Sequence, residues 1–220
     1  MIITIDGPAG SGKSTIARET AKALGIAFLD TGATYRAVTL KALHQGVNMK
    51  DGAALASLAR DADIRLAPAA DGLKVFLDGV DVTKDIRNAE VTENAHYVAD
   101  SPQVREVLVA LQRRLGQPLG SFVTEGRDQG SVVFPNADYK IYLDAAPQVR
   151  ARRRYNELIA AGQQADFDQV LASIIQRDHR DRSRSVAPLV KPAGAVMIDS
   201  SEMTVEQAAS AVLKVVGGGR

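Results

Sequence analysis

The stretch that most constrains the fold is residues 2–24, where a short apolar run turns into a glycine-rich loop and then into a helical pattern. Isoleucine fills three of the first five positions, as is typical of a buried parallel strand. Pro8 ends the run, because proline has no N–H to give to a neighbouring strand. After the loop, apolar residues recur at helical spacing as far as Leu24. The chain is therefore expected to begin with a strand, a tight loop and a helix.

The loop has the spacing of a phosphate-binding loop (P-loop), with Gly7, four further residues, and then Gly12, Lys13 and Ser14. Glycines let successive backbone N–H groups point at a phosphate chain without collisions from a Cβ atom. We expect the Lys13 side chain to face solvent and reach the β- and γ-phosphates, and the Ser14 hydroxyl to bind Mg²⁺. The alternative is a glycine-rich turn without a ligand, which the flanking strand and helix disfavour. The predicted nucleoside triphosphate site consists of Gly7, Pro8, Ala9, Gly10, Ser11, Gly12, Lys13, Ser14 and Thr15.

Composition limits the partners of the chain. Its 220 residues, 45% of them hydrophobic, suit one domain or one core with insertions. With 27 basic and 26 acidic residues there is no net field to hold nucleic acid or an anionic membrane, so we expect neither partner. The absence of cysteine excludes disulfides and thiolate metal sites. With no apolar run of about 18 residues and no signal pattern at the N-terminus, we expect a soluble, cytoplasmic protein.

Polar residues follow several predicted strands. A second apolar run, 26–29, comes after the first helix and makes a βαβ unit, whose strand ends are a binding edge. Residues 30–36 and 126–130 lie at such edges, the latter after a predicted strand at 121–125. Further strands are predicted at 139–143 and 195–198, which brings the count to five.

Residues 64–87 differ from the rest. Three short runs of alternating character, 64–66, 73–77 and 80–82, are separated by the turn sequences Ala-Ala-Asp-Gly and Asp-Gly. This pattern predicts a small antiparallel sheet inserted into the parallel fold. Helices are expected to follow at about 88–99 and 102–115.

Residues 150–184 hold eight arginines and no lysine, against five acidic residues. Guanidinium is preferred where a planar group must grip phosphate oxygens, whereas a solvated helix face normally mixes both cations. An ordinary basic face is the alternative. Next to a phosphate-binding loop we favour a mobile lid, since five carboxylates cannot pair with eight guanidiniums and an arginine stabilises a moving phosphoryl group.

Four segments in order, TIDGPAGSGKST, LDTGATYRAV, GRDQGSVVFP and RDHRDRSRSVAPL, resemble the bacterial cytidylate kinases of the P-loop nucleoside monophosphate kinase family. The resemblance covers nearly the whole chain. It implies an α/β fold with a five-stranded parallel core, at about 1–36, 116–148 and 186–216. It also implies an acceptor-binding insertion at about 37–115 and a lid at about 149–185. The implied function is phosphorylation of CMP, and of dCMP, by Mg-ATP, in a transferase of pyrimidine metabolism expected to act as a monomer.

The resemblance also implies roles for single residues. Thr31, Arg36 and Arg127 match residues that hold the acceptor phosphate. Asp128 and Arg105 match cytosine contacts, and a carboxylate accepts from the cytosine amine, which a uracil carbonyl cannot replace. Residues around the ribose, base and phosphate match Asp181, Arg184 and Arg177, and the implied catalytic residues are Lys13, Arg127, Arg177 and Arg184. His96 stands where the family has a serine that helps to hold the cytosine.

Several alternatives stay open at this stage. Asp181 can instead pair with neighbouring arginines, and Arg105 can be a solvated helix residue. Asp30 and Glu125 can orient waters of Mg²⁺ or act as cap and turn residues. A GTPase-like switch is disfavoured, because the sequence has neither Asp-x-x-Gly nor Asn-Lys-x-Asp. A kinase for another nucleoside monophosphate or for shikimate is a nearer rival.

Overall fold

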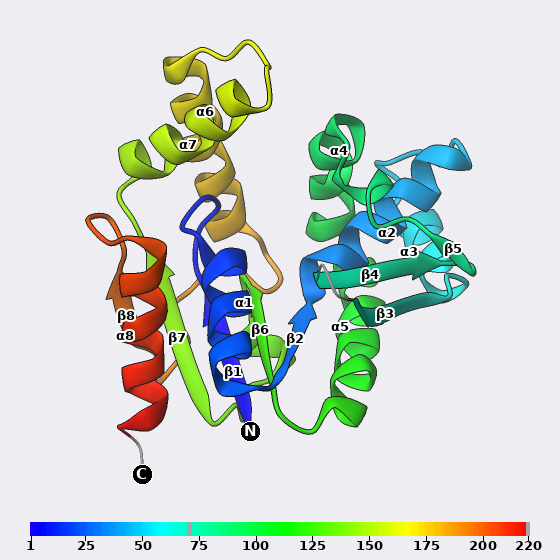
Figure 1. Cartoon of the computed structure of the whole chain (residues 1–220). Helices are drawn as coiled ribbons and strands as arrows, with labels where there is room; N and C mark the ends of the chain where they lie inside the picture. Colours follow the sequence, from blue (N-terminus) through cyan, green and yellow to red (C-terminus); the bar gives the residue numbers. More distant parts are fainter. Residues whose placement is uncertain (70–71, 219–220) are drawn as a thin grey trace. The chain divides into compact units, whose positions relative to one another are not determined.

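The computed structural model describes residues 1–69 and 72–218 (Figure 1). The chain forms two compact units, one made of Met1–Phe28 and Ser121–Arg220 and the other of Leu29–Gly120. The division into core, lid and insertion given above is finer than this one and stays a prediction.

A five-stranded parallel sheet is the centre of the first unit, with the strand order β2-β6-β1-β7-β8. The middle strand, β1, pairs in parallel with β6 and with β7, and β7 pairs in parallel with β8. The strands are β1 (Ile2–Asp6), β2 (Ala27–Asp30), β6 (Phe122–Gly126), β7 (Tyr139–Asp144) and β8 (Val196–Asp199). The predicted parallel sheet is therefore confirmed, with each strand within one or two residues of its expected bounds.

The two faces of β1 differ in character. Ile3 and Ile5 pack into an apolar cluster with residues of α1 (Lys13–Leu24) and α8 (Val205–Gly217), the two helices on that face of the sheet in Figure 1. Thr4 and Asp6 point to the opposite face, as the alternation of a strand requires, and both are fully buried. A short π-helical turn, Gln129–Val133, covers them.

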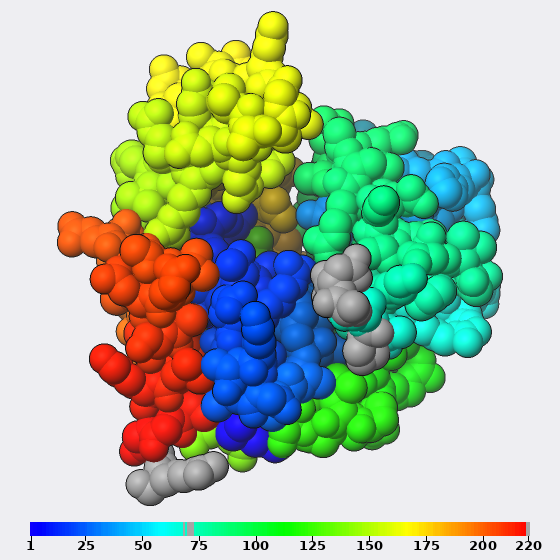
Figure 2. All heavy atoms as spheres, viewed as in Figure 1, coloured from blue at the N-terminus to red at the C-terminus, as the bar shows by residue number. Residues whose placement is uncertain are grey.

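Beyond the carboxyl ends of the strands lie α6 (Pro147–Ala160) and α7 (Phe167–Ser183), which pack against each other. Pro147 starts α6, where the missing N–H of proline costs nothing, and Asp166 caps α7 by accepting from the N–H of Gln169 at 2.8 Å. In Figure 2 the atoms of this segment, yellow-green to yellow, lie above the dark-blue P-loop.

The second unit combines helices with a small antiparallel sheet of order β3-β4-β5. Its buried cluster draws on every helix longer than one turn, with Val38, Leu55, Val98 and Leu108 among its members. The predicted antiparallel insertion is thus confirmed, although Ala70 and Asp71 of its first turn lie outside the described residues. The elements are α2 (Thr31–His44), α3 (Gly52–Arg60), β3 (Ile64–Ala69), β4 (Gly72–Leu77), β5 (Val80–Asp81), α4 (Ala89–Asp100) and α5 (Pro102–Gly116), with single 3₁₀ turns at Asp85–Arg87 and Gln117–Leu119. Of the described helices in the chain, none combines the length and the apolarity needed to cross a membrane.

Candidate active site

The glycine-rich loop, residues 7–12, connects β1 to α1 and is fixed by its surroundings. A Cβ atom on Gly7 would lie 2.0 Å from the carbonyl oxygen of Leu143 in β7, so only glycine fits there. Within the loop, the Ser11 hydroxyl donates to the Pro8 carbonyl at 3.0 Å. The loop leads directly into the N-terminus of α1, the end of a helix that favours anions such as phosphate.

Lys13 departs from expectation, because its side chain is buried and not solvent-facing. It is 5% exposed, and its ammonium donates to the Pro8 carbonyl oxygen at 2.6 Å and contacts the Ser11 hydroxyl at 3.4 Å. The Lys13 ammonium is thus held by the backbone and a side chain of the loop itself. Burial, together with the charges of Arg127 and Arg177, lowers the pKa of Lys13 to about 7, while the charge of Glu125 opposes them.

Ser14 and Glu125 bring two hard oxygen ligands together at the start of α1. The Ser14 hydroxyl donates to Oε1 of Glu125 at 2.6 Å, and Glu125 is the fourth residue of β6. Asp30 differs, since its carboxylate caps α2 by accepting from the N–H of Ala33 at 3.1 Å and pairs with Arg87 at 3.1 Å. The cap alternative is therefore observed for Asp30, whereas Glu125 lies beside the predicted Mg²⁺ ligand.

A carboxylate between two arginines lies on the same unit. Arg127 donates to Asp181 from Nε at 2.8 Å, and Arg184 pairs with the other oxygen of Asp181. Burial alone would raise the pKa of Asp181 and lower that of Arg127. The charges of Arg127 and Arg184 hold the pKa of Asp181 below its usual value, and Asp181 holds the pKa of Arg127 above its usual value. The alternative of arginine pairing is thus observed for Asp181.

Asp128 follows Arg127 in the loop after β6 and is 4% exposed. Its carbonyl oxygen accepts from the N–H groups of Val132 and Val133, at 2.9 and 3.1 Å, which closes the π-helical turn. The backbone around Asp128 is therefore held by hydrogen bonds on the side facing the turn.

Many of the arginines in 150–184 have partners inside the protein. Their excess over carboxylates is therefore weaker evidence for phosphate binding than the sequence alone suggests. Arg150 is 1% exposed and pairs with Asp178, so it forms a buried structural ion pair and does not face solvent as a phosphate ligand would. Arg152 lies over the ring of Phe167 at 4.3 Å. Arg153 donates to the Ser200 carbonyl at 2.6 Å, and Arg154 pairs with Glu157 at 3.1 Å. Of the predicted site residues in this segment, Arg177, Asp181 and Arg184, all belong to the last turns of α7 or follow it directly.

The second unit carries the remaining predicted residues. Thr31 is the first residue of α2 and is 2% exposed. Arg36 donates to the Thr92 hydroxyl at 2.8 Å and to the Ile86 carbonyl at 3.4 Å, which ties α2 to α4.

Arg105 and His96 lie on α5 and α4. Arg105 is 4% exposed, donates to the Ala99 carbonyl at 3.1 Å and lies over the Tyr35 ring at 5.5 Å, so it is not a solvated helix residue. Nδ1 of His96 contacts the Glu93 carbonyl at 2.7 Å, and its ring lies 4.0 Å from that of Tyr97. Both side chains are therefore held by their own unit.

The structure thus divides the predicted site between the units. The first holds the P-loop, Lys13, Ser14, Arg127, Asp128, Arg177, Asp181 and Arg184, and the second holds Thr31, Arg36, His96 and Arg105. Three residues that fix the first unit's site were not assigned to it from the sequence, namely Asp6, Arg150 and Asp178. An acidic residue at the end of a buried strand was the available signal for Asp6.

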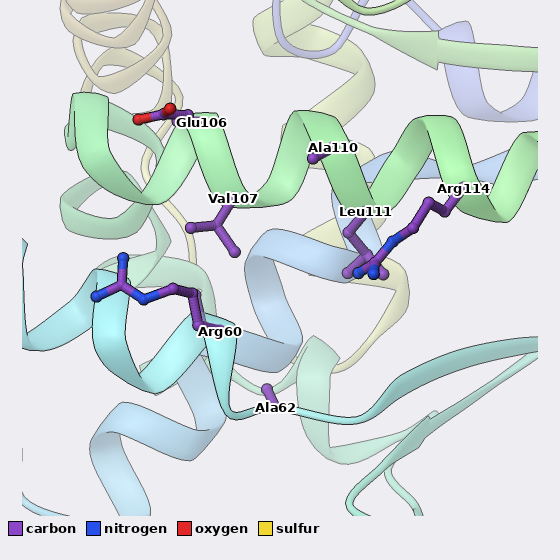
Figure 3. Close-up of a pocket in the computed structure, with 8 residues that line it drawn as sticks. Arg60, Ala62, Glu106, Val107, Ala110, Leu111 and Arg114 are labelled. Atoms are coloured by element: carbon purple, nitrogen blue, oxygen red, sulfur yellow. The ribbon is translucent and has the colours of Figure 1, made fainter.

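A pocket of about 550 Å³ lies in the second unit between α3 and α5. Figure 3 shows Val107 and Leu111 of α5 pointing toward the end of α3 and Ala62, with Arg114 beside Leu111 and Arg60 on α3. Its lining residues, all of them described, include no predicted site residue: Ala59, Arg60, Ala62, Glu106, Val107, Ala110, Leu111 and Arg114. The pocket therefore shares no residue with the predicted nucleotide site.

Comparison with known families decides the assignment. The model of the cytidylate kinase family matches residues 3–217. The chain belongs to this family. As a cytidylate kinase family member it is a nucleoside monophosphate kinase, which transfers a phosphoryl group from ATP.

Relatives within the cytidylate kinase family match the chain from end to end. A cytidylate kinase from Pelotomaculum thermopropionicum is 48% identical over 219 residues, covering 99% of this chain and 96% of the relative. One from Pediococcus pentosaceus is 45% identical over 214 residues, covering 97% and 94%. A shikimate kinase structure from Bacteroides thetaiotaomicron has a TM-score of 0.51 at 14% identity, covering 99% of this chain and 98% of that one, and it supports the fold alone.

Proposed function

We propose that the protein phosphorylates CMP, and also dCMP, with the γ-phosphoryl group of Mg-ATP. The observation that carries the proposal is the pair Arg127 and Asp128 on one loop of the unit that holds the P-loop, with Arg127 fixed by Asp181. An arginine suits the acceptor phosphate, and the neighbouring carboxylate accepts from the cytosine amine.

The donor side uses charges already present in the first unit. Phosphoryl transfer needs little covalent chemistry from the protein and much positive charge around the moving group. Lys13, Arg127 and Arg177 are close enough for the two arginines to lower the pKa of Lys13. ATP would add its phosphates to this cluster, which already contains the carboxylates of Glu125 and Asp181, and Lys13 would exchange the Pro8 carbonyl for phosphate oxygens.

The residues at the start of α1 fit Mg²⁺. The Ser14 hydroxyl and the Glu125 carboxylate are hard oxygen donors within 2.6 Å of each other, and Mg²⁺ prefers one or two such protein ligands and keeps several waters. We assign Ser14 as the direct ligand and Glu125 as the acceptor for a metal-bound water. When bound, Mg²⁺ neutralises charge on the phosphates.

An acceptor panel tests the proposal. ADP release is measured with CMP, dCMP, UMP, AMP and shikimate at equal concentrations. CMP and dCMP should give the highest kcat/KM, and shikimate should give no turnover above background. Faster phosphorylation of UMP or AMP than of CMP would overturn the cytosine assignment but leave the kinase assignment intact.

We further propose that α6 and α7 act as a lid over the donor phosphates. Arg177 and Arg184 at the end of α7 are its candidate phosphate-facing residues, and the connection at 161–166 is largely exposed. Closure over the phosphates would keep water from taking the phosphoryl group. Limited trypsin cleavage within 150–184 should slow at least about fivefold with a bisubstrate analogue, beyond its slowing with ATP alone. Equal cleavage rates in all states would identify a static basic face.

A further inference from the structure

The carboxylate of Asp6 connects the two loops of the first unit that the proposed function uses. Asp6 is the last residue of β1, directly before Gly7 of the P-loop, and it is fully buried. Its Oδ1 accepts from the N–H of Gln129 and its Oδ2 from the N–H of Gly130, each at 2.7 Å. These two amides follow Asp128 directly in the chain. One side chain therefore holds the start of the P-loop and the segment after Arg127 and Asp128 together.

The loop lies so close to β1 that little displacement is tolerated. A Cβ atom on Gly130 would lie 2.7 Å from the Thr4 hydroxyl and 3.2 Å from Oδ2 of Asp6. A Cβ atom on Gly126 would lie 2.8 Å from the Gln129 side chain. The Gln129 amide oxygen also accepts from the Thr124 hydroxyl at 3.1 Å. Both ends of the segment 126–130 are thus fixed on the polar face of the sheet.

The arrangement keeps a charged group inside the protein, which is costly for folding alone. The pKa of Asp6 is raised to about 6, because burial and the charge of Asp128 outweigh the N–H groups of Gly130 and Gln129 and the charge of Lys13, all of which act to lower it. Asp6 is consequently ionised near neutral pH, the state in which both of its oxygens can accept a hydrogen bond.

We infer that Asp6 is a positioning residue, which holds Arg127 and Asp128 where they recognise the acceptor nucleotide. The inference rests on the proposed function, since it concerns how the cytosine-reading loop is placed. An amide at position 6 accepts only one of the two N–H groups and directs its own NH₂ at the other. The loop would then lose its fixed position while the P-loop glycines keep theirs.

The decisive measurement is the ratio of kcat/KM for CMP to kcat/KM for UMP. In Asp6→Asn this ratio should fall at least about tenfold at pH 7.5. KM for ATP should change less than about twofold, because the lost hydrogen bond holds the loop that binds CMP and not the loop that binds ATP. A folded Asp6→Asn protein with the wild-type ratio would overturn the inference. Val212→Ala is the matched control, since it removes buried volume from α8 in the apolar cluster and should lower stability without changing the ratio.

The pH dependence of the wild-type ratio provides a second test. In the wild type the CMP-to-UMP ratio should fall as the pH drops through about 6, because a protonated Asp6 can no longer accept from both amides. The phosphate ionisation of the substrates is common to CMP and UMP and cancels in the ratio. In Asp6→Asn the profile should be flat, and a profile that persists there would exclude Asp6 as its source and overturn the inference. A wild type that does not prefer CMP would refute the proposed function before any variant is made, so the two failures are distinguishable.

Discussion

Arg150 and Asp178 form a two-point ion pair inside the first unit, with N–O distances of 3.1 and 2.6 Å and side-chain exposures of 1% and 6%. The same guanidinium donates to the carbonyl oxygens of Ala9, in the P-loop, and Ala145, before α6, at 3.0 and 2.8 Å. The P-loop, the start of α6 and the second half of α7 therefore meet at one side chain. Any motion of a lid must take place around this fixed point.

Removing one partner of this pair should be strongly destabilising. Asp178→Ala leaves the Arg150 charge buried without its counter-ion, and we expect a loss of about 3–5 kcal/mol in the free energy of unfolding. The double variant Arg150→Met, Asp178→Leu should lose less than the single variant, because it removes both charges. Urea denaturation of the two proteins at pH 7 measures the difference. A double variant less stable than Asp178→Ala would show that the attraction between the two charges stabilises the fold by more than their burial costs.

Lys13→Met should abolish turnover and yet stabilise the fold. The variant lacks the cation for the phosphates, so kcat should fall at least about a thousandfold. Because the folded-state pKa of Lys13 is about 7 and its ordinary value is 10.5, ionised Lys13 costs stability fully below pH 7, and the cost disappears as the pH rises toward 10.5. The gap in unfolding free energy between variant and wild type should therefore narrow between pH 7 and 9. Lys22→Met, on the exposed side of α1, is the control and should show no such narrowing.

Local sequence patterns predicted most of the fold and the identity of the donor loop. The P-loop, the five parallel strands and the antiparallel insertion each depend on residues close together in the chain, such as the isoleucines before Gly7 or the turns around Asp78. The sequence explains the loop glycines only by the need of the backbone to approach a phosphate. The structure adds that Gly7 is also required by the backbone of Leu143, which no local pattern could show.

The rest of the site depends on residues far apart in sequence. Lys13 was expected in solvent because a loop lysine usually is, and its burial follows from how the P-loop folds back on it. The count of carboxylates in 150–184 suggests that several arginines lack partners. Arg152 and Arg153 nevertheless have partners without charge, an aromatic ring and a backbone carbonyl. The link from Asp6 to Gln129 spans 123 residues, beyond the reach of periodicity.

The contact between Ser14 and Glu125 predicts a defined response to Mg²⁺. Ser14→Ala removes the direct ligand, and Glu125→Gln keeps an acceptor for Ser14 but removes the charge that would hold a metal-bound water. The free Mg²⁺ concentration at half-maximal rate should rise about tenfold or more in both variants. Ser11→Ala, which deletes a loop hydroxyl bonded to Pro8, is the control and should leave this concentration unchanged while altering the rate. An unchanged Mg²⁺ requirement in Glu125→Gln would restrict the metal site to Ser14.

His96 provides a test of how CMP is bound, because its contact with the Glu93 carbonyl determines which ring nitrogen remains for the cytosine. The Glu93 carbonyl only accepts, so Nδ1 of His96 is the donor in their 2.7 Å contact, and Nε2 is an acceptor in the neutral ring and a donor in the charged ring. If Nε2 contacts the cytosine, KM for CMP should rise at least about threefold in His96→Ala and return toward the wild-type value in His96→Ser, whose hydroxyl both donates and accepts. KM for ATP is the control and should stay unchanged in both variants. Equal KM values for CMP in the three proteins would remove His96 from the site.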